Sequence, residues 1–147
     1  MTRIIVLSTL VFSLSFYHCT ANDPGKVNIN VIQLTDAAFK QKIFNYEISE
    51  QWKYEGNIPA IVDFYAEWCR TCRVMSPIVE QIAGEFAGKL LVYKVNTDEE
   101  QKLSQSLGIT SLPTLLFIPQ KGQPQASAGG LTKESLIKAI NDVLLIQ

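Results

Sequence analysis

The segment Ala60-Ile-Val-Asp-Phe-Tyr-Ala-Glu-Trp-Cys-Arg-Thr-Cys-Arg73 decides the fold of this chain. Residues 60–66 form a nearly continuous apolar run of strand length, which is typical of a strand buried on both faces. Two cysteines follow, and beyond them apolar residues recur at the spacing of one face of an amphipathic helix: Met75, Ile78, Val79, Ile82, Ala83 and Phe86. Pro77 lies within this helix and predicts a kink. The segment thus predicts a buried strand that leads through two cysteines into a helix.

The sequence before this segment predicts one edge strand and one helix. Residues 29–34 alternate between polar and apolar side chains, which favours a strand, and Thr35 resembles a helix N-cap. The mixed aromatic residues 44–58 are expected to extend that helix and then to form a loop. The sequence leaves the role of this insert open.

The sequence after the segment predicts three strands and two helices. The strands are expected at residues 90–95, 114–118 and 125–128. Between the first two, Thr97-Asp-Glu-Glu100 has the spacing of a capping box, and Gly108 marks a helix end. A last helix is predicted from an apolar face formed by Leu136, Ile137, Ile140, Val143 and Leu144. The order β-α-β-α-β-α-β-β-α predicts an α/β fold in which helices cover both faces of a central mixed sheet.

The composition excludes several classes of function. The chain has 147 residues, of which 47% are hydrophobic and 18% charged, so one domain can bury a core without disulfide bonds. The net charge of −1 supplies no basic surface for nucleic acid. The chain also contains no dinucleotide-binding fingerprint, so no cofactor is expected.

Residues 1–21 are expected to be an export signal. Arg3 gives the segment a positive start, and residues 4–16 form an apolar stretch. This stretch is shorter than the roughly 20 residues that a membrane-spanning helix needs. A signal peptide or a lipoprotein signal is therefore the interpretation that fits best.

Three fates of this signal are open. The chain is cleaved after Ala21, or Cys19 becomes the lipidated first residue of a lipoprotein, or the signal stays as an uncleaved N-terminal anchor. The first two place the chain outside the cytoplasm, in the periplasm or lipid-anchored at a membrane that faces it. In either case residues 22–30 are expected to be a linker and residues 31–147 the domain.

The cysteines point to redox chemistry. Cleavage after Ala21 would leave only Cys69 and Cys72 and would remove the single histidine, His18. Without an imidazole, no Cys–His or Ser–His pair can form, and no metal site is expected. Cys69 falls at the expected helix N-terminus, where N–H groups and the helix dipole stabilise a thiolate. Cys72, one turn later, can then resolve the mixed disulfide that Cys69 forms with a partner.

Two motifs in this chain resemble those of the thioredoxin family. Residues 60–73 are similar to that family's active-site segment, and Ser111-Leu-Pro-Thr114 is similar to its cis-proline loop. Gly129-Gly130 falls where the family has glycine before the last helix. The similarity extends from about Val31 to Leu145 and implies a thioredoxin-like fold.

Asp63 is the candidate for proton transfer. It is a carboxylate within an apolar strand, so desolvation should raise its pKa. The resemblance implies that it acts as a general base that helps to deprotonate Cys72. The alternative is an exposed aspartate on an edge strand. The resemblance implies that Lys94, in the next strand, lies near this carboxylate, and the alternative is a lysine that faces solvent.

The resemblance also implies a place where the substrate docks. Pro113 corresponds to the proline whose preceding peptide bond is cis, and the backbone of Leu112 would pair with an extended substrate segment. Trp68 would form an apolar rim beside Cys69, unless it belongs to the core.

The residues between the two cysteines depart from the family pattern. The usual Gly-Pro is Arg70-Thr71 in this chain. A positive charge beside Cys69 should favour its thiolate and hence the reduced form, which predicts a more oxidising couple than that of an ordinary thioredoxin. The alternative is that Arg70 is a solvated surface residue with little effect.

Taken together, these features predict a thiol–disulfide oxidoreductase that acts on disulfides in other proteins, with a reductase as the first interpretation. A disulfide-forming oxidant or isomerase is the alternative within the same chemistry. A non-catalytic binding module is the alternative outside it. Because no cofactor is expected, electrons must pass to or from a separate protein, such as a membrane-embedded thiol relay. We expect a monomer.

Overall fold

The computed structural model describes residues 30–145 of the chain. The expected export signal, Cys19 included, and all but the last residue of the expected linker lie outside the described residues. No helix within the described range is long and apolar enough to cross a membrane.

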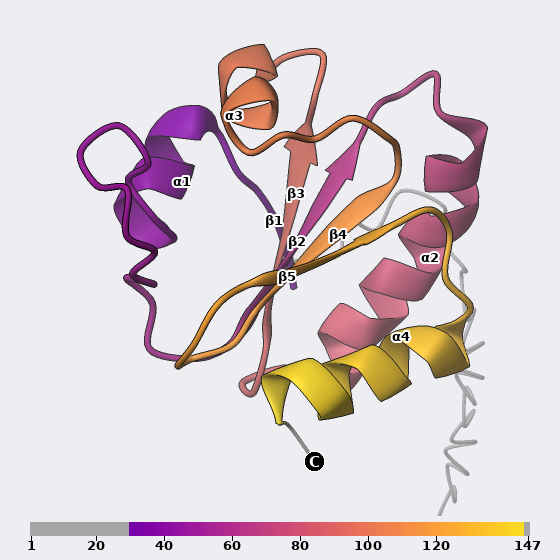
Figure 1. Ribbon diagram of the computed structural model, residues 1–147. Helices are drawn as coiled ribbons and strands as arrows, with labels where there is room; N and C mark the ends of the chain where they lie inside the picture. The colour runs from indigo at the N-terminus through magenta and orange to yellow at the C-terminus, as the bar shows by residue number, and fades with distance from the viewer. Residues whose placement is uncertain (1–29, 146–147) are drawn as a thin grey trace, which may run out of the picture.

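A mixed five-stranded sheet forms the centre of the molecule (Figure 1), in the order β1-β3-β2-β4-β5. β1, β2 and β3 run parallel to one another, whereas β4 is antiparallel to β2 and β5 is antiparallel to β4. The strands are β1 (Val31–Gln33), β2 (Ala60–Tyr65), β3 (Leu91–Asn96), β4 (Thr114–Ile118) and β5 (Gln125–Ala128). The expected mixed sheet is therefore confirmed. The carboxyl ends of the three parallel strands share one edge of the sheet, and their amino ends share the opposite edge.

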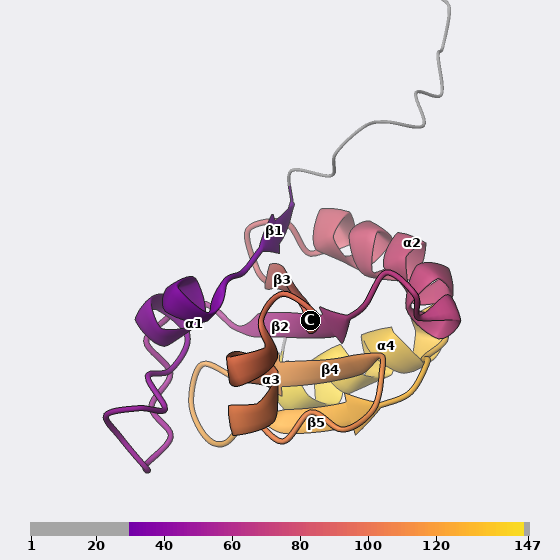
Figure 2. The same cartoon turned by 90° about the horizontal axis from the view of Figure 1, so that it is seen from above.

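Helices cover both faces of this sheet, as expected. Seen from above (Figure 2), α1 and α3 lie on one side of the sheet and α2 and α4 on the other. The helices are α1 (Asp36–Lys42), α2 (Arg70–Glu85), α3 (Gln101–Ser106) and α4 (Lys133–Ala139), which continues as a π-helical turn, Ile140–Leu144. Pro77 lies inside α2, as expected.

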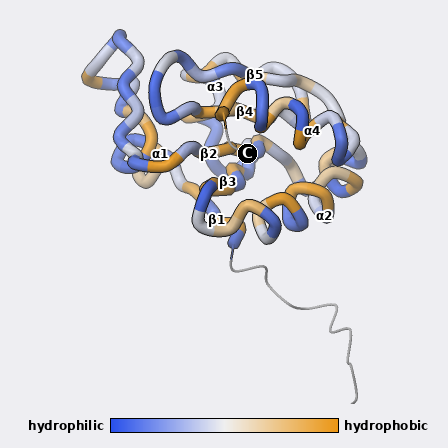
Figure 3. The backbone as a smooth tube through the Cα atoms, turned by 90° about the horizontal axis from the view of Figure 1, so that it is seen from below, coloured by the Kyte–Doolittle hydropathy of each residue, from blue (hydrophilic) through white to orange (hydrophobic). Residues whose placement is uncertain are grey.

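Alternation along the strands divides the core into two halves. Ala60, Val62 and Phe64 of β2 pack with the α1 and α3 side, whereas Ile61 packs with α2 and α4. Figure 3 shows that the hydrophobic stretches follow these central strands. Because side chains alternate along a strand, Asp63 shares the face of Ile61 and points toward the α2 side. A carboxylate thus interrupts the apolar face against which α2 packs.

Two local predictions are confirmed. Thr35 caps α1, because its side-chain oxygen accepts a hydrogen bond from the Ala38 N–H at 3.3 Å. Gly108 follows the end of α3 with φ of +67°, a left-handed conformation that glycine adopts without steric cost.

The expected helix extension over residues 44–58 is wrong. α1 ends at Lys42, and the chain then folds back in turns, so that the Glu55 N–H donates to the Ile43 carbonyl at 2.9 Å. The rings of Phe44 and Trp52 pack together, with centroids 4.9 Å apart. The free energy gained by burying these aromatic side chains against the α1 side of the core exceeds that of continuing the helix.

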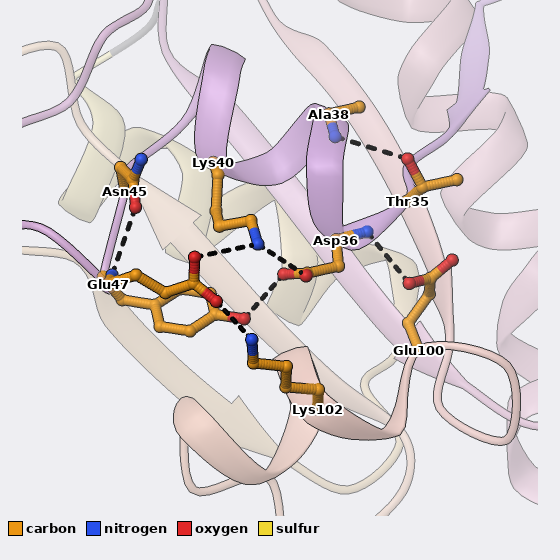
Figure 4. Close-up of polar contacts among 9 residues, drawn as sticks. Thr35, Asp36, Ala38, Lys40, Asn45, Glu47, Glu100 and Lys102 are labelled. Carbon is orange, nitrogen blue, oxygen red and sulfur yellow. Dashed lines mark hydrogen bonds and ion pairs between the residues drawn. The ribbon is translucent and has the colours of Figure 1, made fainter.

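A polar cluster fastens this insert to α1 and α3 (Figure 4). The Tyr46 hydroxyl donates to Asp36 at 2.6 Å, and the Lys40 ammonium lies 2.9 Å from Asp36 and 3.2 Å from Glu47. Lys102 of α3 forms an ion pair with the same Glu47. These contacts join the first turn of the insert to both helices on that face.

The expected capping box at residues 97–100 is also wrong. α3 begins after Glu100, which makes no side-chain cap hydrogen bond. The Thr97 hydroxyl donates instead to the Tyr65 carbonyl at 3.2 Å, and the Glu100 carboxylate accepts from the Asp36 N–H at 2.9 Å. Both side chains that the local pattern assigned to the cap are therefore hydrogen-bonded to groups from other parts of the fold.

Candidate functional site

The two cysteines lie at the sheet edge where the parallel strands end. Cys69 is the N-cap of α2 and Cys72 lies in its first turn, and the two form a disulfide with 5.3 Å between their Cα atoms. Both are nearly buried, at 6% and 4% exposed. The Cys72 N–H donates to the Cys69 sulfur at 3.1 Å. A helix N-terminus that directs an N–H group at this sulfur favours negative charge there once the disulfide is reduced.

The loop before β4 packs against these cysteines. Its Leu112–Pro113 peptide bond is cis, which confirms the expectation drawn from the resemblance. Leu112 packs against the small buried cluster that contains both cysteines. The Pro113 carbonyl accepts a hydrogen bond from the Gly129 N–H at 2.8 Å, which fixes the loop to the chain after β5. Leu112 is therefore in contact with the cluster that contains both cysteines, and its role toward a substrate stays a prediction.

Trp68 is a surface residue and not part of the core. Its side chain is 69% exposed, and its indole N–H donates to the Asp98 carboxylate at 3.0 and 3.3 Å from the two oxygens. The core alternative is therefore wrong, and the role of this ring as a rim beside Cys69 stays a prediction. Sequence reasoning missed this role of Asp98, because the residue lies thirty positions away and the local pattern around it indicated a helix cap.

Arg70 and Thr71 are both exposed. No described residue forms an ion pair with Arg70, so its charge is directed to solvent beside the cysteines. Both sequence interpretations of Arg70 therefore remain predictions.

Asp63 is buried, which excludes the exposed edge-strand alternative. It is 1% exposed, and burial raises its pKa from 3.8 to about 6, while the charge of Lys94 opposes that rise. Its Oδ1 atom has no hydrogen-bond partner within residues 30–145. A carboxyl with such a pKa exchanges protons readily near neutral pH, as a general acid or base must. Its role toward Cys72 stays a prediction.

Lys94 lies opposite Asp63 on the neighbouring strand, but its ammonium makes other contacts. The two residues are register partners in the parallel β2–β3 pair. The Lys94 Nζ donates to the Ser76 hydroxyl at 2.8 Å and lies 4.5 Å from the centre of the Tyr65 ring. Lys94 is half-buried, so it is neither a fully solvated lysine nor a hydrogen-bonded partner of Asp63.

A cavity of about 120 Å³ opens beside Cys72. Its walls come from the end of β2, the first turns of α2 and β3: Tyr65, Ala66, Glu67, Cys72, Arg73, Ser76 and Lys94. The second cysteine and the polar side chains of Ser76 and Lys94 thus line the same cavity. Within the described residues, no group of three His, Cys, Asp or Glu side chains is arranged to hold a metal ion.

Thr71 and Gly130 are in close contact across the site. A Cβ atom at residue 130 would lie 2.9 Å from the Thr71 Cγ2 methyl, closer than carbon atoms approach without rearrangement. Gly130 therefore leaves room for a branched side chain between the cysteines.

We expect Gly130→Ala to lower the free energy of unfolding by about 1 kcal/mol. The steric cost of overpacking is about 1–3 kcal/mol. It exceeds the gain of about 0.4–1 kcal/mol that alanine brings by making the unfolded chain less flexible. Urea unfolding of the oxidised protein measures this difference. The double variant with Thr71→Ser, which lacks the methyl, should recover the loss. An unchanged stability of the single variant would mean that the Thr71 methyl moves aside freely.

Comparisons of the sequence and of the structure both match this chain to thioredoxins. A sequence model of the thioredoxin family matches residues 30–142. A thioredoxin from Borreliella burgdorferi is 42% identical over 111 residues, which cover 76% of this chain and 95% of that protein. Chloroplastic thioredoxin M4 of Arabidopsis thaliana is 33% identical over 127 residues, or 86% of this chain and 61% of that protein. Among solved structures, chloroplastic thioredoxin z superposes with a TM-score of 0.66 at 26% identity, covering 76% of this chain and 92% of that one.

Proposed function

Because this chain belongs to the thioredoxin family and is a thiol–disulfide oxidoreductase, we propose that it works outside the cytoplasm as a reductase of disulfides in other proteins. The observation that carries the proposal is the Cys69–Cys72 disulfide at the N-terminus of α2, next to the Leu112–Pro113 loop. That arrangement presents one sulfur to a partner and keeps the second within bonding distance of the first.

Reduction of a substrate proceeds in two exchanges. The Cys69 thiolate attacks one sulfur of the substrate disulfide, so that a mixed disulfide forms and the other substrate sulfur leaves as a thiolate. Cys72 then loses its proton and attacks the Cys69 sulfur, which releases the second substrate thiolate. The substrate gains two electrons, and the protein is left with the disulfide described above. Asp63 accepts the Cys72 proton in the second exchange.

Several features support an extended protein segment as the substrate. Leu112 packs against the cysteine cluster, in the loop before β4. Its backbone is proposed to pair with an extended segment of the substrate. The exposed Trp68 ring adds an apolar contact next to Cys69. Recognition through backbone groups and one apolar rim suits many different sequences, as a general reductase needs.

The export signal expected at residues 1–21 supports a location in the periplasm, or at a membrane that faces it, for a protein that acts as a monomer. A separate redox protein, such as a membrane-embedded thiol relay, returns electrons to the oxidised form. Mass spectrometry of the mature N-terminus distinguishes the three fates of the signal. A terminus at Asn22 indicates cleavage, a lipid-modified Cys19 indicates a lipoprotein, and an intact Met1 indicates an anchor.

The midpoint potential of the Cys69–Cys72 couple tests the reductase proposal. Trp68 lies beside the disulfide, so its fluorescence follows a titration in graded dithiothreitol and glutathione buffers. A midpoint near that of thioredoxin, about −270 mV, supports a reductase that a partner must recharge. A midpoint near −120 to −180 mV would overturn it in favour of a disulfide-forming oxidant or isomerase.

Arg70 is the residue that favours this second candidate, since its exposed charge lies beside Cys69. We expect replacement of Arg70-Thr71 by Gly-Pro to move the midpoint to more negative values, because the reduced thiolate loses a favourable charge. The shift is at most about 30 mV for each pH unit by which the Cys69 pKa rises, and solvent screening reduces it. The single variant Arg70→Gln separates the charge from the backbone change. An unchanged midpoint in both variants would show that Arg70 is only a surface residue.

A further inference from the structure

Asp63 and Lys94 would be expected to form an ion pair, yet the structure separates their charges. They face each other across the parallel β2–β3 pair and share the face of the sheet that α2 covers. A lysine side chain is long enough to reach a carboxylate on the neighbouring strand. Nevertheless Asp63 Oδ1 has no hydrogen-bond partner in the described part of the chain, and the Lys94 ammonium lies 2.8 Å from the Ser76 oxygen.

The contacts of Ser76 explain this separation. Its hydroxyl donates its only proton to the Glu80 carboxylate at 3.3 Å, which leaves its lone pairs to accept from Lys94. The Tyr65 ring lies on another side of the ammonium, 4.5 Å away, and adds a cation–π attraction. A hydroxyl, a ring and a carboxylate behind the hydroxyl thus hold the Lys94 charge at the wall of the cavity beside Cys72.

We propose that Ser76 is a positioning residue for thiol exchange, whose hydroxyl holds the Lys94 ammonium at the cavity wall and so leaves the Asp63 carboxyl unpaired for proton exchange with Cys72. The inference rests on the role proposed above for Asp63. Two residues lie opposite Asp63 on the neighbouring strands, Lys94 on β3 and the uncharged Leu115 on β4. Tyr65, two positions along β2, also interacts electrostatically with Asp63, and Cys72 of α2 lines the same cavity as Lys94. Burial raises the pKa of Asp63, and Lys94 is the charge that opposes this rise, so the position of Lys94 modulates the proton affinity of Asp63.

The second exchange requires a proton to leave Cys72 and, in the reverse direction, to return to it. Cys72 gives up a proton as it attacks Cys69, and it takes a proton back when the disulfide is reduced. A carboxyl whose pKa is near neutral can accept in one direction and donate in the other. An ammonium paired with Asp63 would lower its pKa and leave little of the protonated form at neutral pH. Ser76 prevents that pairing.

The test is a titration of the Asp63 carboxyl, followed by its ¹³C chemical shift in the oxidised protein, where neither cysteine titrates. In Ser76→Ala the ammonium loses its acceptor and can move to Asp63, so we expect the Asp63 pKa to fall by about one pH unit. Ser76→Thr keeps a hydroxyl at the same place and should restore the original value. In a Lys94→Met background, Ser76→Ala should have no effect, because the charge is gone.

Two results would overturn the proposal. One is an Asp63 pKa that does not change in Ser76→Ala. The other is an equal fall in the Lys94→Met background, which would trace the effect to altered solvation and not to Lys94. The carboxyl titration needs no turnover, whereas reduction of insulin by the wild-type protein tests the reductase proposal separately. Failure of the insulin assay with an intact titration result would reject the reductase function and leave the role of Ser76 in place.

Discussion

A Cys72→Ser variant is expected to stop after the first exchange and to accumulate a mixed disulfide between Cys69 and its substrate. A Cys69→Ser variant should form no such adduct, because the helix N-terminus and the Cys72 N–H favour the thiolate at Cys69 and not at Cys72. Both variants should lose turnover of a protein disulfide by about 10³-fold or more, since each lacks one of the two exchanges.

Non-reducing electrophoresis and intact-mass analysis after mixing with oxidised insulin distinguish these outcomes. The two serine variants are matched controls for each other, because each keeps one thiol in the same helix turn. A covalent adduct that forms with Cys69→Ser and not with Cys72→Ser would show that the order of attack is reversed.

An Asp63→Asn variant is expected to be more stable than the parent protein at pH 7.5, by up to about 3 kcal/mol. Asp63 has a pKa of about 6 in the folded protein, compared with 3.8 as its ordinary value. Between those two pH values the unfolded chain releases this proton and the folded chain keeps it. Stability therefore falls as the pH rises through this window, by about 1.4 kcal/mol for each pH unit. Asparagine carries no charge and abolishes this dependence.

Urea unfolding of the oxidised protein from pH 3.5 to pH 8 measures the effect. The difference between the two proteins should be small below pH 4, grow up to about pH 6 and then stay constant. Because both side chains are polar and similar in shape, the growth of that difference isolates the buried charge. A difference that stays the same across the whole range would show that Asp63 titrates as an exposed carboxyl does.

The order of the strands and helices was predictable because each core element has a strong hydrophobic pattern. The run at residues 60–66 and the apolar face that begins at Met75 have different periods, and both reflect burial in the same core. β5 was located from turn chemistry before it, since Gln125–Ala128 itself is polar and largely exposed. Local sequence patterns were sufficient to predict a strand or helix wherever the pattern agreed with the burial of its side chains.

The sequence did not predict contacts that depend on distant partners. The pattern at Thr97 and Glu100 is that of a helix cap, but both side chains bind groups from other elements. The same limit explains why Asp98 and Ser76 were missed. Their importance comes from the Trp68 indole and the Lys94 ammonium, which the fold brings to them from thirty and eighteen positions away. A single hydroxyl in an amphipathic helix gives no signal of such a contact.

Because β1 runs parallel to β2 and β3, the start of the domain and the reactive sulfurs lie at opposite edges of the sheet. This separation affects the distance of the sulfurs from a lipid surface. The chain enters β1 at the sheet edge opposite the cysteines, so a tether that begins at Cys19 would approach the domain from its far side. Residues 20–30 extend to at most about 35–40 Å, and the length of the strands adds to that reach. If the chain is lipid-anchored, as one of the proposed fates has it, this reach sets the greatest distance from the bilayer at which the dithiol can meet a partner.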